Sequence, residues 1–399
     1  MDHRPTSTSA SSEAKELIEL IQRGEDSRVQ FKQTVSNPES LAGDLVAFSN
    51  TKGGRMVIGV SDQGAVVGLS ADDIRRINQL VSNTATNLVR PSVNPTTENI
   101  SVEGRLVMVV TVQEGISKPY SDNQGVFWVK SGADKRRVTA REEIQRMLQS
   151  AELVHADELP IEGTTTADLD LEHFRGFFAK VYGDPLDETL ERDGHSLGRL
   201  LNNLGLAREE KLNLAGLMLF GRQPQRYRPA FVVKAVSFAG NDPAGLTYRD
   251  SEDIKGCLRD LHKQMMSFLT RNLRRLQGDQ GFNSEGELEV PYAALEELVV
   301  NMLLHRDYFV SAPWRILLFD DRIELISPGA LPNSLTVENI RHGVSIIRNP
   351  LIASFATKEL PYRGIGTGIR RALAAMPQLV FESDPERNLF TVTIPRKTG

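Results

Sequence analysis

Cysteine is almost absent from this sequence. Cys257 is the one cysteine among 399 residues, so no disulfide can form within the chain and no cysteine-rich zinc site can be built. Such a composition favours a reducing, cytoplasmic setting. The sequence has no apolar run long enough to span a bilayer, and its first dozen residues lack the apolar core of a signal peptide. We therefore expect neither a disulfide-stapled secreted fold nor a membrane partner.

An excess of positive charge is also missing. The chain has 47 lysines and arginines against 52 aspartates and glutamates, a formal net charge of -5. This balance excludes a generally basic, histone-like protein but leaves room for a local nucleic-acid-binding patch. Apolar residues make up 40% and charged residues 25%, as in folded globular domains. At this length we expect two or three packed domains.

The hydrophobic pattern divides the chain into four parts. Residues 1–12, rich in serine and threonine, predict a disordered tail, and residues 13–150 mix helix and strand patterns as one domain. An acidic, threonine-rich linker from His155 to Asp170 then opens a middle α/β domain over residues 151–285, and residues 286–399 form the last domain. The predicted fold class is α/β and α+β, with several domains.

One predicted helix, beginning near Pro291, carries polar residues along a single face. Glu297, Asn301 and His305 follow one another at intervals of four, which places them on the same side of a helix. Leucines and valines occupy most of its other positions, so the polar face is expected to line a cavity. A solvated polar stripe is the alternative.

Three glycines spaced by two open a later helix. The segment Gly364-Ile365-Gly366-Thr367-Gly368 precedes an apolar helical pattern. Such a loop leaves backbone N–H groups free to face an anion. Tight helix packing is the alternative explanation for glycines in this position.

In their order along the chain, these segments resemble the conserved boxes of GHKL ATPases. The resemblance rests on Glu297-x-x-x-Asn301, Ser327-Pro328-Gly329 and Gly364-x-Gly366-x-Gly368. More narrowly, the chain resembles the C-terminal ATP-binding domain of proteins labelled RecG-related helicases or transcriptional regulators, through His305-Arg306-Asp307-Tyr308, Asp321-Arg322-Ile323-Glu324 and Arg348-Asn349-Pro350. The resemblance implies a C-terminal GHKL-like α/β sandwich that binds ATP and Mg²⁺.

The same resemblance implies roles for individual residues. Asn301 would hold Mg²⁺ through its amide oxygen, and Glu297 would activate the attacking water as a general base. The other implied nucleotide-binding residues are Ser327, Gly329, Arg348, Gly364, Gly366, Thr367 and Gly368. GHKL proteins usually carry an aspartate that binds the adenine amine where Ser327 stands, and a hydroxyl is a weaker, uncharged acceptor. The sequence leaves open which base is recognised and whether ATP is hydrolysed, and a weak ATPase activity is possible. Helicase activity finds no support, because no G-x-x-x-x-G-K-[ST] loop occurs.

The first domain resembles the AlbA-like domain of the Schlafen proteins, over roughly Glu13 to Gln149. The matching motifs are Glu25-x-x-x-x-Gln30-Phe31-Lys32, Ala47-Phe48-Ser49-Asn50-Thr51-Lys52-Gly53-Gly54 and Ile58-Gly59-Val60-x-Asp62. In Schlafen nucleases three clustered carboxylates serve RNA cleavage with a divalent metal. Glu25 and Asp62 match two of those positions, and Gln30 stands at the third. An amide lacks the negative charge that a hard cation favours, so the resemblance implies a degenerate nuclease-like site.

A cluster of basic residues follows the predicted strand that bears Trp128. It consists of Lys130, Lys135, Arg136 and Arg137. These side chains could neutralise phosphates while the indole stacks on a base. A solvated face explains the cluster equally well.

Three functions agree with these features. The favoured one is an ATP-binding, nucleic-acid-binding regulator such as a transcriptional regulator, with DNA preferred to RNA as its partner. The second is a Schlafen-like, metal-dependent RNase, and the third is a non-enzymatic scaffold with a degenerate ATP site. The family resemblance and general frequency favour a homo-oligomer.

Overall fold

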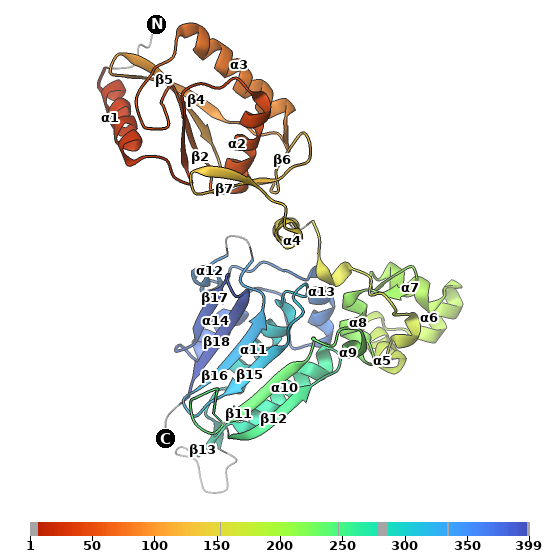
Figure 1. Cartoon of the computed structure of the whole chain (residues 1–399). Helices are drawn as coiled ribbons and strands as arrows, with labels where there is room; N and C mark the ends of the chain where they lie inside the picture. The colour runs from red at the N-terminus through yellow and green to blue at the C-terminus, as the bar shows by residue number, and fades with distance from the viewer. Residues whose placement is uncertain (1–6, 152, 246, 278–285, 333–334, 397–399) are drawn as a thin grey trace. The chain divides into compact units, whose positions relative to one another are not determined.

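The computed structural model describes residues 7–151, 153–245, 247–277, 286–332 and 335–396. It divides the chain into two compact units, Met1–Leu153 and Val154–Gly399. Both units combine helices with β-sheets (Figure 1). The predicted fold class, a mixed α/β protein of several domains, is therefore confirmed. In the part of the chain that the structure describes, no helix is both long and apolar enough to cross a membrane.

The first unit is built on a four-stranded sheet of order β1-β2-β5-β4. Its strands are β1 (Val29–Lys32), β2 (Gly54–Ile58), β4 (Thr96–Val102) and β5 (Arg105–Val112). β1 and β2 are parallel, and the other pairs are antiparallel. Because side chains alternate along a strand, Met56 and Ile58 pack with α2 (Pro38–Asn50) and α3 (Ala71–Asn87), whereas Val57 packs with α1 (Ser7–Arg23). The sheet thus lies between helices on its two faces.

The boundaries of α1 and α2 have local causes. α2 begins after Asn37, whose side chain accepts hydrogen bonds from the backbone N–H groups of Glu39 and Ser40 at 2.9 and 3.0 Å. It ends before Gly53, which has a φ of +68°, and a Cβ there would lie 2.6 Å from the carbonyl oxygen of Val112. α1 begins at Ser7. Residues 7–12 are therefore helical, contrary to the predicted tail, while residues 1–6 lie outside the described residues.

Short elements complete the first unit. β3 (Val89–Arg90) pairs with β6 (Ser121–Asp122), and β7 (Trp128–Ser131) forms a hairpin with β8 (Asp134–Arg137). α4 (Arg141–Ser150) follows this hairpin.

The second unit is organised by a six-stranded sheet of order β12-β11-β15-β16-β18-β17. The strands are β11 (Val233–Phe238), β12 (Tyr248–Ile254), β15 (Trp314–Leu318), β16 (Arg322–Pro328), β17 (Val380–Asp384) and β18 (Leu389–Pro395). β11 and β15 are parallel and the remaining pairs antiparallel. Three helices pack on this sheet: α10 (Leu258–Asn272), α11 (Tyr292–Leu304) and α14 (Gly368–Ala375). On this sheet α11 and α14 also pack against each other.

This sheet crosses the boundary that the sequence predicted between residues 285 and 286. β11 and β12 precede that point, yet β11 pairs directly with β15. The predicted middle and C-terminal domains therefore share one sheet and one core. The predicted linker also belongs to this core, because Ala156, Ile161 and Leu169 within it are buried.

The remaining elements of the second unit form a helical part and small ribbons. The helices are α5 (Leu171–Tyr182), α6 (Leu186–Asp193), α7 (Leu197–Asn203), α8 (Leu214–Phe220), α9 (Pro224–Tyr227), α12 (Val337–Arg341) and α13 (Pro350–Glu359), with 3₁₀ turns at Ala156–Glu158 and Thr166–Asp168. The ribbons pair β9 (Ala207–Arg208) with β10 (Lys211–Leu212) and β13 (Arg275–Leu276) with β14 (Glu287–Leu288). Phenylalanine rings of α5, α8 and α13 pack together and join these three helices.

Candidate functional site

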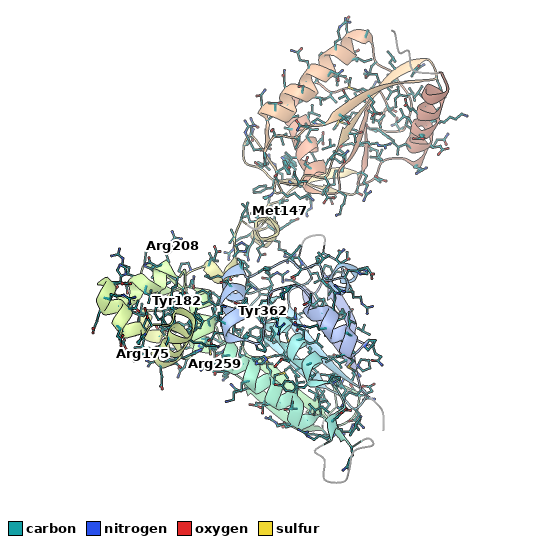
Figure 2. The ribbon with its side chains drawn as sticks, turned by 180° about the vertical axis from the view of Figure 1, so that it is seen from behind. Met147, Arg175, Tyr182, Arg208, Arg259 and Tyr362 are labelled. Atoms are coloured by element: carbon teal, nitrogen blue, oxygen red, sulfur yellow. The ribbon has the colours of Figure 1, made fainter. Side chains whose placement is uncertain are left out.

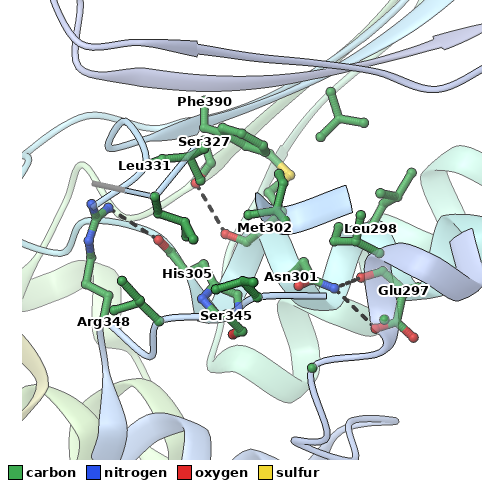
Figure 3. A pocket seen from close by; sticks show the side chains of 18 of the residues that line it. Glu297, Leu298, Asn301, Met302, His305, Ser327, Leu331, Ser345, Arg348 and Phe390 are labelled. Atoms are coloured by element: carbon green, nitrogen blue, oxygen red, sulfur yellow. Dashed lines mark hydrogen bonds between the residues drawn. The ribbon is translucent and has the colours of Figure 1, made fainter. Parts of the chain in front are cut away.

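A pocket in the second unit brings together the predicted nucleotide-site residues, which come from distant parts of the sequence (Figure 3). It lies between α11, the end of β16, the segment that leads to Arg348, and the glycine loop. Glu297, Asn301, Ser327, Gly329, Arg348, Gly364, Gly366, Thr367 and Gly368 all line it. Its apolar lining includes Leu298, Met302, Leu325, Leu331, Ile340, Phe390 and Val392. The pocket is thus concave and largely apolar with a few polar groups, as ligand sites usually are.

The polar face of α11 is held in place by a contact between its own side chains. The Asn301 amide nitrogen donates to the carbonyl oxygen of Glu297 at 2.7 Å and to Glu297 Oε1 at 3.2 Å. These bonds occupy the amide nitrogen, so the oxygen of the same amide points away from Glu297. No hydrogen bond reaches that oxygen from the described residues, and Asn301 lines the pocket.

Glu297 is also held from α14. It is 9% exposed, and Arg371 Nη2 donates to its Oε2 at 2.6 Å. A Cβ built on Gly368 would overlap Oε1 of Glu297 and lie 2.6 Å from its Cδ. Only glycine therefore permits this approach of α14 to the carboxylate.

Arg371 and Tyr362 are pocket residues that the sequence analysis missed. Tyr362, labelled in Figure 2, lines the pocket, and burial followed by the charge of Glu297 raises its pKa. Arg371 is separated from Glu297 by 74 positions. No local spacing links such distant residues, so no motif could have revealed this ion pair.

Ser327 is the penultimate residue of β16, and its side chain contacts α11. It is 7% exposed, and its hydroxyl donates to the carbonyl oxygen of Met302 at 3.3 Å. Because this bond uses the hydroxyl proton, the oxygen lone pairs remain available as acceptors. Among the described residues that line the pocket, Glu297 is the one acidic side chain. Within that lining, no second carboxylate therefore replaces the aspartate that the resemblance leads one to expect at Ser327.

Arg348 lies near the C-terminal end of α11. Its guanidinium donates to the carbonyl oxygens of His305 at 3.4 Å and Ala330 at 2.7 Å. Burial, followed by the positive charge of Arg348, lowers the pKa of His305 to about 4, so His305 is neutral at pH 7.

Gly329 has a φ of +107°, and a Cβ there would lie 2.5 Å from Cβ of Asp307. Glycine is thus needed for the close approach of these segments.

The neighbouring motif residues serve the structure around the pocket. Arg306 is fully buried, donates to the carbonyl oxygens of Val310 and Ala312 at 2.6 Å, and lies over the ring of Trp314 at 4.3 Å. Asn349 is fully buried as well and donates to two carbonyls at the end of α11, at 2.8 and 2.9 Å. These contacts hold the end of α11 against the segment that carries Arg348.

A buried carboxylate at the start of the second unit was also missed by the sequence analysis. Asp157 has no exposed surface and accepts a hydrogen bond from the backbone N–H of Ile352 at 2.8 Å, in the first turn of α13. Burial raises its pKa to about 6.

The nuclease-like positions of the first unit do not form a metal site. Glu25 Oε1 accepts from the backbone N–H of Phe31 at 2.6 Å, and Asp62 is exposed in the turn after β2. Gln30 buries its amide oxygen with no hydrogen-bond partner among the described residues. Across those residues, no group of three or more His, Cys, Asp or Glu side chains could hold a metal ion.

The predicted basic cluster lies on the β7–β8 hairpin, but much of its charge is engaged within the unit. Lys135 pairs with the buried Asp44 at 3.0 Å, and Arg136 pairs with Glu143 at 2.6 Å. Burial lowers the pKa of Lys130. Arg137 is exposed and lies over the Trp128 ring at 5.1 Å, with no ion pair to any described residue. Arg137 is thus the member of the basic cluster best placed to contact a phosphate, whereas Trp128 is half-buried and its indole N–H donates to Asp122 Oδ2 at 2.9 Å.

Two family models match this chain. Residues 25–139 match the family described as Schlafen, AlbA_2, and residues 312–394 match the family described as "Putative ATP-dependent DNA helicase recG C-terminal". The chain therefore carries a Schlafen AlbA_2 domain and a C-terminal ATPase-like domain, which confirms the resemblance seen in the motifs. The second match begins after α11, so Glu297 and Asn301 lie outside it.

Similar solved structures include two from bacteria. The crystal structure of the DIP2311 protein from Corynebacterium diphtheriae is 19% identical over 97% of this chain and 81% of its own, with a TM-score of 0.47. The solution structure of the N-terminal domain of a RecG-related protein from Nitrosomonas europaea is 24% identical over 32% of this chain and 95% of its own, with a TM-score of 0.23. No protein of curated function matches the sequence.

Proposed function

We propose that this chain, which joins a Schlafen AlbA_2 domain to an ATPase-like domain, is a regulator that binds Mg²⁺-ATP in the pocket of its second unit and nucleic acid through its first. The observation that carries the proposal is the Asn301 amide. Its nitrogen is fixed by Glu297, and its oxygen lines the pocket beside the glycine loop. An amide oxygen is a hard ligand of the kind that Mg²⁺ accepts.

The residues around Asn301 suit a triphosphate. Gly364 and Gly366 have φ angles of +68° and +73°, a backbone shape that glycine adopts without strain and that can turn N–H groups toward an anion. α14 begins directly after this loop at Gly368, so the positive end of its dipole faces the same side. Mg²⁺ bound at Asn301 would neutralise phosphate charge.

The other end of the pocket suits a flat, apolar base. Leu331, Phe390 and Val392 supply apolar surface, and the Ser327 oxygen can accept one hydrogen bond from an exocyclic amine. A neutral hydroxyl accepts more weakly than a carboxylate. We therefore infer that the pocket discriminates adenine from guanine less strongly than a site with an aspartate.

Isothermal titration of the full chain with ATP and Mg²⁺ tests the proposal. We expect ATP to bind, and we expect EDTA and Asn301→Ala each to weaken this binding. Each should raise the Kd at least about tenfold, which corresponds to a loss of roughly 1.4 kcal/mol of binding free energy. Asn202→Ala, at an exposed position of α7, is the matched control and should leave the Kd unchanged. Equal titration curves for Asn301→Ala and the unmodified chain would contradict the assigned role, and absence of binding heat would favour the scaffold alternative.

For the first unit we propose nucleic-acid binding without cleavage, with DNA preferred to RNA. The exposed guanidinium of Arg137, which lies over the half-buried Trp128 ring, supports binding, and the lack of a three-carboxylate group among the described residues weighs against metal-dependent cleavage.

A further inference from the structure

Both carboxylate oxygens of Glu297 are engaged. Oε1 accepts from the Asn301 amide at 3.2 Å, and Oε2 accepts from Arg371 Nη2 at 2.6 Å. The carboxylate is almost fully buried, and the backbone of Gly368 packs directly on it. A water molecule that approached Oε2 would therefore have to compete with a charge-assisted hydrogen bond.

This geometry conflicts with the chemistry expected of a general base. In nucleotide hydrolysis the water oxygen bonds to the terminal phosphorus, and the bond from that phosphorus to the bridging oxygen breaks. The bridging oxygen leaves with the electron pair, and the water proton passes to the base. The base must offer a free lone pair within hydrogen-bond distance of the water. In Glu297 each oxygen already accepts one hydrogen bond, and burial together with the backbone of Gly368 restricts access of water to the lone pairs that remain.

We propose that Arg371 is an inhibitory positioning residue, which holds Glu297 away from water so that the pocket retains nucleotide without rapid turnover. This inference rests on the proposed function of the same pocket. Arg371 lies on the first turn of α14, immediately after the phosphate-binding loop, and its side chain is 47% exposed. Solvent can hydrate the guanidinium once the pair opens. A movement of α14 would thus release the base, which couples turnover to the conformation of the glycine loop.

The test compares Arg371→Gln with Arg370→Gln in the full chain. Arg370 is the exposed neighbour on the same helix and forms no ion pair with any described residue, so it is a matched control. Titration with Mg²⁺-ATP gives the Kd, and phosphate release under saturating nucleotide gives kcat. Arg371→Gln should raise kcat at least about tenfold, because a general base contributes roughly 100- to 10,000-fold. The Kd should change by less than about twofold, and Arg370→Gln should match the unmodified chain.

Two further variants separate this role from a merely structural one. Arg371→Lys keeps the cation and should stay close to the original rate. Adding Glu297→Gln to Arg371→Gln should abolish the gain, because the released base is then absent.

The other outcomes overturn the inference in distinguishable ways. If Arg371→Gln leaves kcat unchanged or lowers it while binding persists, Arg371 does not restrain Glu297. If Arg371→Gln abolishes binding, Arg371 is a nucleotide ligand instead. If the unmodified chain binds no nucleotide, the proposed function fails and this inference fails with it.

Discussion

Replacing Gly368 by alanine tests the contact between α14 and the carboxylate of Glu297. Gly368 is the first residue of α14, and helix propensity alone predicts that alanine stabilises a helix relative to glycine. The structure predicts instead that alanine at this position lowers the stability of the protein. The new methyl group would overlap Oε1 of Glu297 and lie 3.2 Å from its Cγ. Either α14 or the carboxylate has to move.

The size of the expected loss in unfolding free energy follows from the hydrogen bonds that such a movement breaks. The hydrogen bond from Arg371 to Glu297 is charge-assisted, and bonds of this kind contribute about 1.5–3 kcal/mol. Since Arg371 is about half exposed, the lower end applies and the expected loss is about 1.5 kcal/mol. For a unit of this size, 1 kcal/mol shifts the Tm by about 2–4 °C. We therefore expect Gly368→Ala to lower the Tm by about 3–6 °C.

Gly176→Ala is the matched control. Gly176 lies within α5 next to Arg175, which is labelled in Figure 2, and a Cβ there would meet nothing within 4 Å. Alanine should stabilise this helix by about 0.5–1 kcal/mol. Thermal unfolding followed by circular dichroism or calorimetry measures both variants. A Tm for Gly368→Ala equal to or above that of the original chain would refute the reasoning.

Three further substitutions probe other parts of the structure. Asn349→Ala leaves two buried carbonyls at the end of α11 without their donor, and denaturant titration should show a loss of about 2–4 kcal/mol. Asp157→Asn keeps an acceptor for the backbone N–H of Ile352 but cannot ionise. The raised pKa of about 6 means that the folded state binds more protons than the unfolded state between about pH 4 and 6. Stability of the original chain should therefore fall as pH rises through this window, by about 3 kcal/mol at most, and the variant should lack this slope. Arg137→Ala should weaken binding of a fluorescent DNA duplex in anisotropy titrations, whereas Arg136→Ala, whose guanidinium is already paired, should change it less.

Much of the second unit could be predicted from its sequence because the relevant signals are local. A helix has a fixed period, so Glu297 and Asn301 could be placed on one face of α11 without knowledge of the fold. The three glycines also predicted the loop before α14. This prediction needed no knowledge of the fold, because the glycines and the helical pattern that follows them are adjacent in the sequence. The family matches confirm the Schlafen AlbA_2 domain and the C-terminal RecG-related, ATPase-like domain, although Glu297 and Asn301 lie outside the second match.

The basic cluster shows where local patterns stop being informative. Lys135, Arg136 and Arg137 are consecutive in the sequence, but the carboxylates that engage two of them lie on other elements: Asp44 on α2 and Glu143 on α4. The alternation of β8 cannot reveal which of its side chains meets a buried acid. The same limit applies to the core around the predicted linker and to the sheet that crosses residues 285 and 286.

The sequence by itself determined the types of element, the order of the motifs and which residues are candidates for the proposed phosphate and Mg²⁺ site. These properties depend on backbone periodicity and side-chain chemistry over a few neighbouring positions. Only the tertiary structure decided how the groups are paired. Arg371 meets Glu297 across 74 positions because α11 and α14 pack together, and Gly368 permits that approach because it has no side chain. Contacts between distant positions arise from packing, and the pairing of the proposed base could be known only once the fold was in view.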